Sequence, residues 1–104
     1  MAKVRNLRLI TIVAQRKDEE LVIGCMRDAG ATGVTFHPAS GTGVRQKFER
    51  VGRLIQIEKT VLLTTVPAET APKIVKAVKD ALGLDRPGNG FICVQRVEEA
   101  VGLL

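Results

Sequence analysis

Apolar residues alternate or run together in four short segments of this chain and recur every three to four residues in two others. The first pattern predicts β-strands and the second predicts amphipathic helices. Strands are predicted at residues 7–14, 33–36, 54–66 and 91–95, and helices at residues 17–29 and 72–82. The order strand-helix-strand-strand-helix-strand predicts an α+β fold of ferredoxin-like βαββαβ topology, with two helices on one face of an antiparallel sheet.

Glycine and proline mark the ends of these elements. Gly30 and Gly83 follow the two helical patterns, and Pro72 suits the first turn of the second helix. A glycine-containing loop is predicted at residues 38–43, followed by a basic, polar stretch at residues 44–53 without clear periodicity. Long surface segments of this kind are mobile and often carry function.

The first strand carries apolar side chains on both faces. Leu7, Leu9 and Val13 share one side, and Ile10 and Ile12 share the other. Two helices cover only one face of a sheet, so the other face would expose an apolar patch that monomers usually avoid. We therefore expect an oligomer in which sheet faces pack together.

Composition narrows the class of protein. The chain has 104 residues and is 45% hydrophobic, which predicts one domain over residues 1–104 with a core of its own. The net charge of +5 favours anionic partners. No apolar run is long enough to span a membrane, and the basic N-terminus lacks a secretory hydrophobic region, so we expect a cytoplasmic protein without membrane insertion.

The chain offers little for metal binding or catalysis. Cys25 and Cys93 are far apart and form no CxxC motif, so we interpret them as small apolar residues of the core. His37 is the only histidine and lacks an adjacent nucleophile or orienting carboxylate. We expect no firm metal site and no enzymatic activity.

Two glycine-rich segments are candidates for phosphate binding, because glycines let backbone N–H groups approach an anion closely. The first is Gly41-Thr42-Gly43-Val44-Arg45-Gln46-Lys47, in which Arg45 can grip a phosphate with two hydrogen bonds. The second is Gly88-Asn89-Gly90, directly before the last strand. A flexible hairpin loop and a plain tight turn are the structural alternatives.

Taken together, four segments resemble the P-II signal-transduction family. They are residues 30–35, 41–47, 87–92 and 97–102, in the family's order and near its spacing. The resemblance implies a homotrimer of ferredoxin-like subunits that binds an adenine nucleotide (AMP, ADP or ATP) in clefts between neighbours. It also implies that a long T-loop, here residues 41–59, docks on an unknown target enzyme or membrane transporter, and that a B-loop, here residues 85–90, forms the opposite wall.

The resemblance also assigns nucleotide-binding residues one by one. The implied set is Thr35, Gly41, Gly43, Arg45, Gln46, Lys59, Gly88, Asn89 and Gly90. Phe91 stands where the family usually has a lysine after the B-loop, and the C-terminal paired arginines are missing. Fewer cations imply weaker triphosphate binding, or a mono- or diphosphate ligand. No tyrosine is present, which excludes uridylylation of a T-loop tyrosine.

Two other classes of function fit parts of the pattern. An RNA-recognition module shares this strand order, but it stacks bases on exposed strand aromatics, and this chain has three Phe and no Tyr or Trp. Glu49 and Glu58 also dilute the basic stretch, so we expect no nucleic-acid partner. A metal-handling trimer similar to the CutA copper-tolerance proteins, or another small-ligand-binding ferredoxin-like trimer, is the other alternative.

Overall fold

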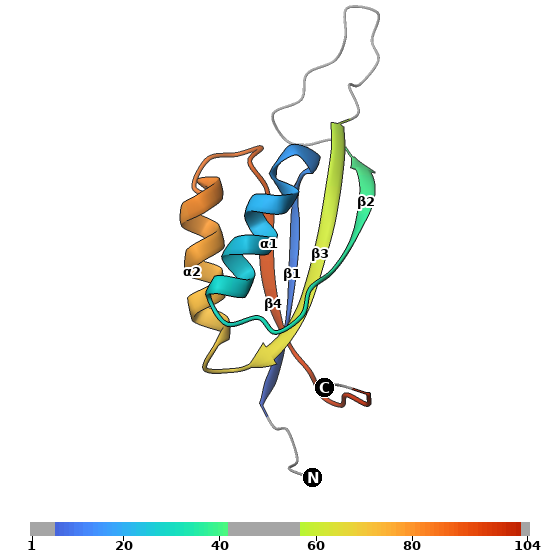
Figure 1. The fold of residues 1–104 in the computed structure, drawn as a ribbon, viewed down its shortest axis with the longest axis vertical. Helices are drawn as coiled ribbons and strands as arrows, with labels where there is room; N and C mark the ends of the chain where they lie inside the picture. Colours follow the sequence, from blue (N-terminus) through green and yellow to red (C-terminus); the bar gives the residue numbers. More distant parts are fainter. Residues whose placement is uncertain (1–5, 42–56, 103–104) are drawn as a thin grey trace, which may run out of the picture.

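The computed structural model describes residues 6–41 and 57–102, which form four strands, two α-helices and one turn of 3₁₀ helix (Figure 1). The elements in chain order are β1 (Leu7–Gln15), η1 (Arg16–Asp18), α1 (Glu19–Asp28), β2 (Thr35–Gly41), β3 (Ile57–Pro67), α2 (Ala71–Leu82) and β4 (Phe91–Arg96). This order confirms the predicted βαββαβ arrangement. The first turn of the predicted helix 17–29 is the 3₁₀ turn η1.

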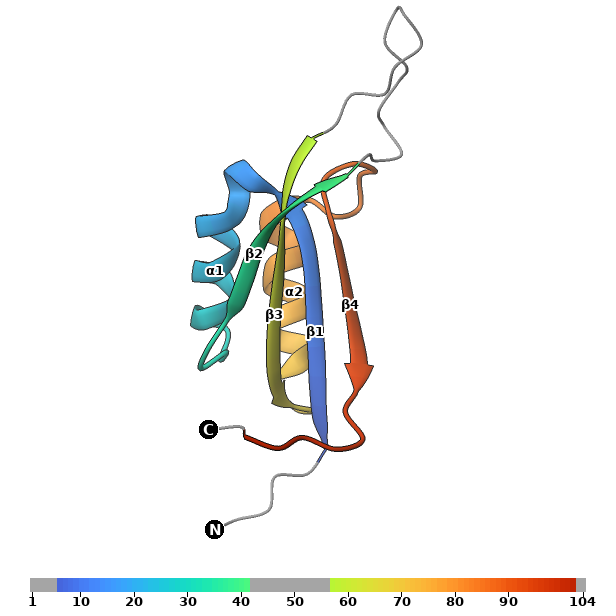
Figure 2. The same cartoon turned by 90° about the vertical axis from the view of Figure 1, so that its right-hand side faces the viewer.

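The four strands form one antiparallel sheet in the order β2-β3-β1-β4. The two central strands are β1 and β3, and the two edge strands are β2 and β4. Both helices lie on one face of this sheet, as Figures 1 and 2 show from two directions. The predicted ferredoxin-like fold is therefore confirmed.

The core lies between the sheet and the two helices. Its sheet side comes from alternate residues of the central strands, and its helix side comes from one face of each helix. The largest members with almost no exposed surface are Ile10, Ile12, Leu62, Val66, Val22, Met26, Ile74 and Val78. Each such side chain contributes about 1.5–3 kcal/mol by leaving water. The alternation also means that Leu9 and Val13 point to the opposite face of β1.

Two predicted helix ends are confirmed, and each glycine has a distinct reason to be there. Gly83 adopts a left-handed φ of 64° after α2, and its N–H donates to Lys79 O at 3.0 Å. Gly30 follows α1 with a φ of 121°, and a Cβ atom there would lie 2.8 Å from Thr70 Cγ2. Another residue at this position would be strained at this φ and would require the Thr70 side chain to move, so glycine favours the close approach of the end of α1 to the start of α2.

The boundary between β2 and the loop differs from the prediction. The sequence pattern predicts a loop from residue 38, but β2 continues to Gly41, which pairs with Ile57. Pairing with the long strand β3 extends β2 beyond its apolar residues. Pro38 is tolerated because β2 is an edge strand, where a missing N–H need not face a neighbour. Strand pairing thus extends into both ends of the segment predicted as the T-loop.

The sheet face opposite the helices is a mixed apolar and polar surface. Residues paired across strands share a face, so one row contains His37, Val61, Val13 and Phe91, and the next contains Thr35, Leu63, Thr11 and Cys93. Phe91 is 55% exposed. Neither helix covers this face, which we call the open face. Its apolar side chains agree with the expectation that a second chain packs against it.

Candidate functional site

Two of the predicted binding residues, Gly41 and Lys59, lie at one end of the sheet, where the chain leaves β2 and returns in β3. Gly41 pairs with Ile57, and Lys59 pairs with Ala39. A Cβ atom on Gly41 would lie 3.6 Å from Lys59 Cδ and Cε, so the lysine stem lies against the glycine. Gly43, Arg45 and Gln46 lie outside the described residues.

Thr35 is at the other end of β2. Gly41 lies six positions further along β2, which is about 20 Å in an extended strand. Its side chain is on the open face opposite Leu63 and is exposed. Within one chain, Thr35 is therefore not brought together with Gly41 and Lys59.

The predicted B-loop is a tight turn that rests against the end of β1. Gly88 has a φ of 91° and Gly90 a φ of 141°, and residues with a side chain rarely adopt such angles. Gln15 Nε2 donates to Gly88 O at 3.4 Å. A Cβ atom on Gly90 would lie 2.9 Å from Val13 O, so this position requires glycine for packing as well as for its backbone angle.

Asn89 points inward rather than toward a cleft. Its Nδ2 donates to Leu82 O at 3.0 Å and to Gly83 O at 3.1 Å. These carbonyls belong to the end of α2, where the last helical C=O groups lack partners within the helix. In this chain, the Asn89 side chain therefore links the turn to α2, a role that the sequence reasoning missed.

The two glycine-bearing groups lie at the same end of the sheet but at its opposite edges. Gly41 is on edge strand β2, whereas Gly88 and Gly90 precede edge strand β4, with β3 and β1 between them. Three strand spacings amount to about 14 Å. Within residues 6–41 and 57–102, the two groups are thus separated by the width of the sheet.

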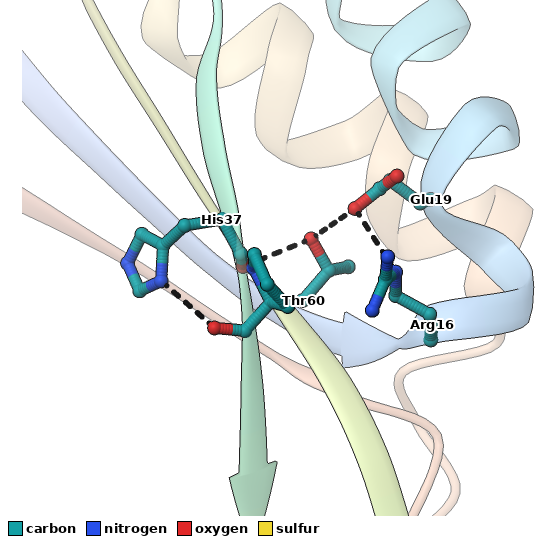
Figure 3. Close-up of polar contacts among 5 residues, drawn as sticks. Arg16, Glu19, His37 and Thr60 are labelled. Atoms are coloured by element: carbon teal, nitrogen blue, oxygen red, sulfur yellow. Dashed lines mark hydrogen bonds and ion pairs between the residues drawn. The ribbon is translucent and has the colours of Figure 1, made fainter.

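A polar cluster missed by the sequence reasoning joins α1 to the strands that carry the loop (Figure 3). The buried Thr60 hydroxyl donates to Glu19 Oε2 at 2.6 Å and lies 3.4 Å from His37 O. Arg16 Nε lies 3.8 Å from the same carboxylate oxygen. From the sequence alone, Glu19 is predicted only to be an acidic residue near the start of a helix. The only signal in the sequence is that Thr60 alternates with Leu62, which places its hydroxyl on the core face of β3.

The histidine and the two cysteines, which are the remaining candidates for metal binding or catalysis, lie in different parts of the fold. The exposed His37 ring lies on the open face, with Nδ1 3.1 Å from Pro38 O. Cys25 packs against the core and Cys93 lies on the open face, and both are half-buried free thiols. Within residues 6–41 and 57–102, no three His, Cys, Asp or Glu side chains are grouped as metal ligands would be.

The family of this chain follows from comparison with protein-family models. Residues 7–103 match the family described as nitrogen regulatory protein P-II. The chain belongs to the P-II family. This confirms the resemblance drawn from its glycine-rich motifs. A comparison with curated proteins finds no match for this P-II protein.

Solved structures share the fold of this P-II protein. The B. subtilis GlnK–ATP complex is 18% identical, with a TM-score of 0.69 over 92% of this chain and 85% of that one. A putative PII-like signalling protein from Thermus thermophilus is 25% identical, with a TM-score of 0.63 over 88% of this chain and 85% of that one. A Bacillus cereus protein related to NIF3 is 20% identical, with a TM-score of 0.72 over 94% of this chain but only 27% of that one.

The described helices of this P-II protein are too short or too polar to cross a bilayer.

Proposed function

We propose that this P-II protein binds an adenine nucleotide between adjacent subunits of a trimer and thereby regulates a target protein. The observation that carries the proposal is the position of the two glycine-bearing groups, at one end of the sheet but on opposite edge strands. The half-exposed apolar side chains of the open face support assembly through that face. The similarity to a GlnK–ATP complex supports a nucleotide as the ligand.

Regulation would work by a shift in conformational population. The segment between β2 and β3 starts at Gly41 and returns beside Lys59, so a ligand held at these residues contacts both ends of that segment. A ligand changes such an equilibrium only if it binds the alternative conformations with different affinities. The nucleotide would select the conformation that the target enzyme or transporter recognises. The protein therefore acts as a binding regulator rather than as an enzyme.

The charges near the site favour a ligand with fewer phosphates than ATP. On the B-loop side, the last glycine is followed by Phe91, an exposed apolar side chain, where a cation would serve a triphosphate better. Lys59 and the predicted Arg45 remain for phosphate on the other side. We therefore expect AMP or ADP to bind at least as tightly as ATP.

The proposal is tested by isothermal titration of AMP, ADP and ATP into the wild type and Arg45→Ala. The substitution should weaken nucleotide binding roughly 10- to 100-fold, because it removes charge-assisted hydrogen bonds, and should leave the oligomer intact. Arg27→Ala removes the same charge from the exposed surface of α1 and should change nothing. Equal affinities in the wild type and Arg45→Ala would contradict this assignment of the site.

A further inference from the structure

The two edges of the sheet carry exposed apolar side chains on the face where the helices lie. Phe36 of β2 pairs with Leu62, and Val94 of β4 pairs with Ile10, so each shares a face with a buried core residue. Phe36 is nevertheless 48% exposed and Val94 is 40% exposed. Among the large apolar side chains that the structure describes, only these two combine such exposure with a place on the helix face of an edge strand.

The apolar surface beside Val94 is hollowed into a groove. The groove runs between α2 and β4 and has a volume of about 530 Å³. Its apolar lining includes Ala71, Val75 and Val94, and its charged lining consists of Arg8, Lys76, Lys79 and Asp80. A recess of this size can take an aromatic side chain, and aromatic anchors in such pockets carry much of the binding energy at protein interfaces.

Phe36 and the groove lie at comparable distances from the loop end of the sheet. The strand β2 finishes at that end, whereas β4 starts there and runs away from it (Figure 2). Phe36 is five positions before the last residue of β2, about 17 Å, and Val94 is three positions after the first residue of β4, about 10 Å. Two chains placed with these strand ends level have antiparallel edges. Phe36 of one chain then falls opposite Arg96 of the next and diagonal to Val94, within reach of an aromatic side chain.

We propose that Phe36 of each chain packs into the groove between α2 and β4 of the next chain, an inference that rests on the trimer of the proposed function. The contact is heterologous, because the anchor is on one edge of a chain and the groove is on the other. Each chain therefore uses both features once in a closed ring. The Phe36 ring contacts Val75 and Val94, and the Arg96 guanidinium lies against the ring as a cation over an aromatic face.

This contact would fix the level of one edge strand against the other. Phe36 is on the strand that ends at Gly41, and Val94 is on the strand that begins directly after Gly90. Packing of Phe36 in the groove therefore holds the β2 end of one chain level with the turn before β4 of the next, where the nucleotide cleft is proposed. Phe36 is a positioning residue in this arrangement and does not touch the nucleotide.

The energetic role of Phe36 is tested by light scattering over a dilution series. Phe36→Ala should raise the concentration of half-assembly at least roughly tenfold, because the aromatic anchor is lost, whereas Phe36→Leu should retain most of the assembly. Val75→Gln changes the groove wall and should weaken assembly in the same way. Leu21→Ala truncates a side chain of similar exposure, 49%, on α1 and should assemble like the wild type. Circular dichroism checks that each variant is folded.

The contact itself is tested by NMR of an assembly mixed from two batches of wild-type chain, one with protonated phenylalanine in a deuterated background and one with labelled valine methyl groups. Nuclear Overhauser effects should connect the Phe36 ring of one batch to the methyl groups of Val75 and Val94 of the other, and they should disappear in Phe36→Leu.

The possible failures are distinguishable. A wild-type trimer without these effects, or a Phe36→Ala protein that assembles as tightly as the wild type, would overturn this inference and leave the proposed trimer and its nucleotide site standing. A wild-type trimer that shows the effects but binds no nucleotide would contradict the proposed function and leave the contact standing. A monomeric wild type would overturn both.

Discussion

Gly90 is constrained both by its backbone angle and by close packing. Its φ of 141° lies outside the range of most side chains, and a Cβ atom there would lie 2.9 Å from Val13 O. Asn89, its neighbour, donates to two carbonyls at the end of α2. The turn before β4 is therefore fixed from both sides, by close backbone packing and by side-chain hydrogen bonds. A turn fixed in this way can present its backbone N–H groups to a ligand without being ordered by it.

Gly90→Ala should lower the free energy of unfolding by about 1–3 kcal/mol, because alanine is strained at this φ and its methyl group would meet a backbone oxygen. Gly24→Ala is the matched control, since no atom outside its own helix lies within 4 Å of a Cβ built there. That substitution in α1 should raise stability by about 0.5–1 kcal/mol. Urea unfolding measures both. A Gly90→Ala protein as stable as the wild type would contradict the description of this turn.

The start of α1 is tied to the strands that carry the loop through one buried hydroxyl. Thr60 is fully buried and donates to Glu19, which also lies near Arg16. A buried hydroxyl without a partner is unfavourable, so this contact constrains where the first turn of α1 can lie on β3. The ends of β2 and β3 are thereby held against a helix just before the chain enters the segment that joins them.

A double-mutant cycle measures this link between α1 and β3. Glu19→Ala should destabilise the protein by about 1–3 kcal/mol, because it leaves the Thr60 hydroxyl with only a long contact to a carbonyl. In the presence of Thr60→Val the same change should matter less, with a coupling of about 0.5–3 kcal/mol. Glu20→Ala, at the exposed neighbouring position, should stay within about 0.5 kcal/mol. Additive effects of the Glu19 and Thr60 substitutions would show that the two side chains do not interact.

The periodicity of apolar residues predicts which segments form helices and strands, but it does not predict how these elements contact one another. Strand 7–14 and helix 72–82 are predicted to within a residue, because long apolar patterns and glycine stops are local signals. The extension of β2 to Gly41 is missed, because its cause is pairing with β3 rather than its own composition. The inward direction of Asn89 and the contact between Glu19 and Thr60 depend on residues six to 41 positions apart. Such contacts become visible only once the sheet order is known.

At the scale of the whole molecule, the sheet has one face covered by helices and one face open. Central apolar residues of the open face, such as Val13, Val61 and Leu63, are only half-buried in the single chain. The two edges of the sheet carry different glycine-bearing groups, so a ring of chains would bring one kind of edge beside the other. In the proposed trimer, nucleotide binding depends on assembly, because each cleft would take one sheet edge from each of two chains.

The most direct test of this account combines light scattering with nucleotide titration for the wild type and Val61→Glu. A charge in the middle of the open face should leave the single chain folded but prevent assembly, because an unpaired buried charge is strongly unfavourable. Leu21→Glu is the control, since Leu21 is 49% exposed on α1. The account predicts that the wild type and the control have the mass of three chains and bind adenine nucleotide, whereas Val61→Glu is a folded monomer that does not. A Val61→Glu monomer that binds nucleotide as tightly as the wild type would contradict the intersubunit site.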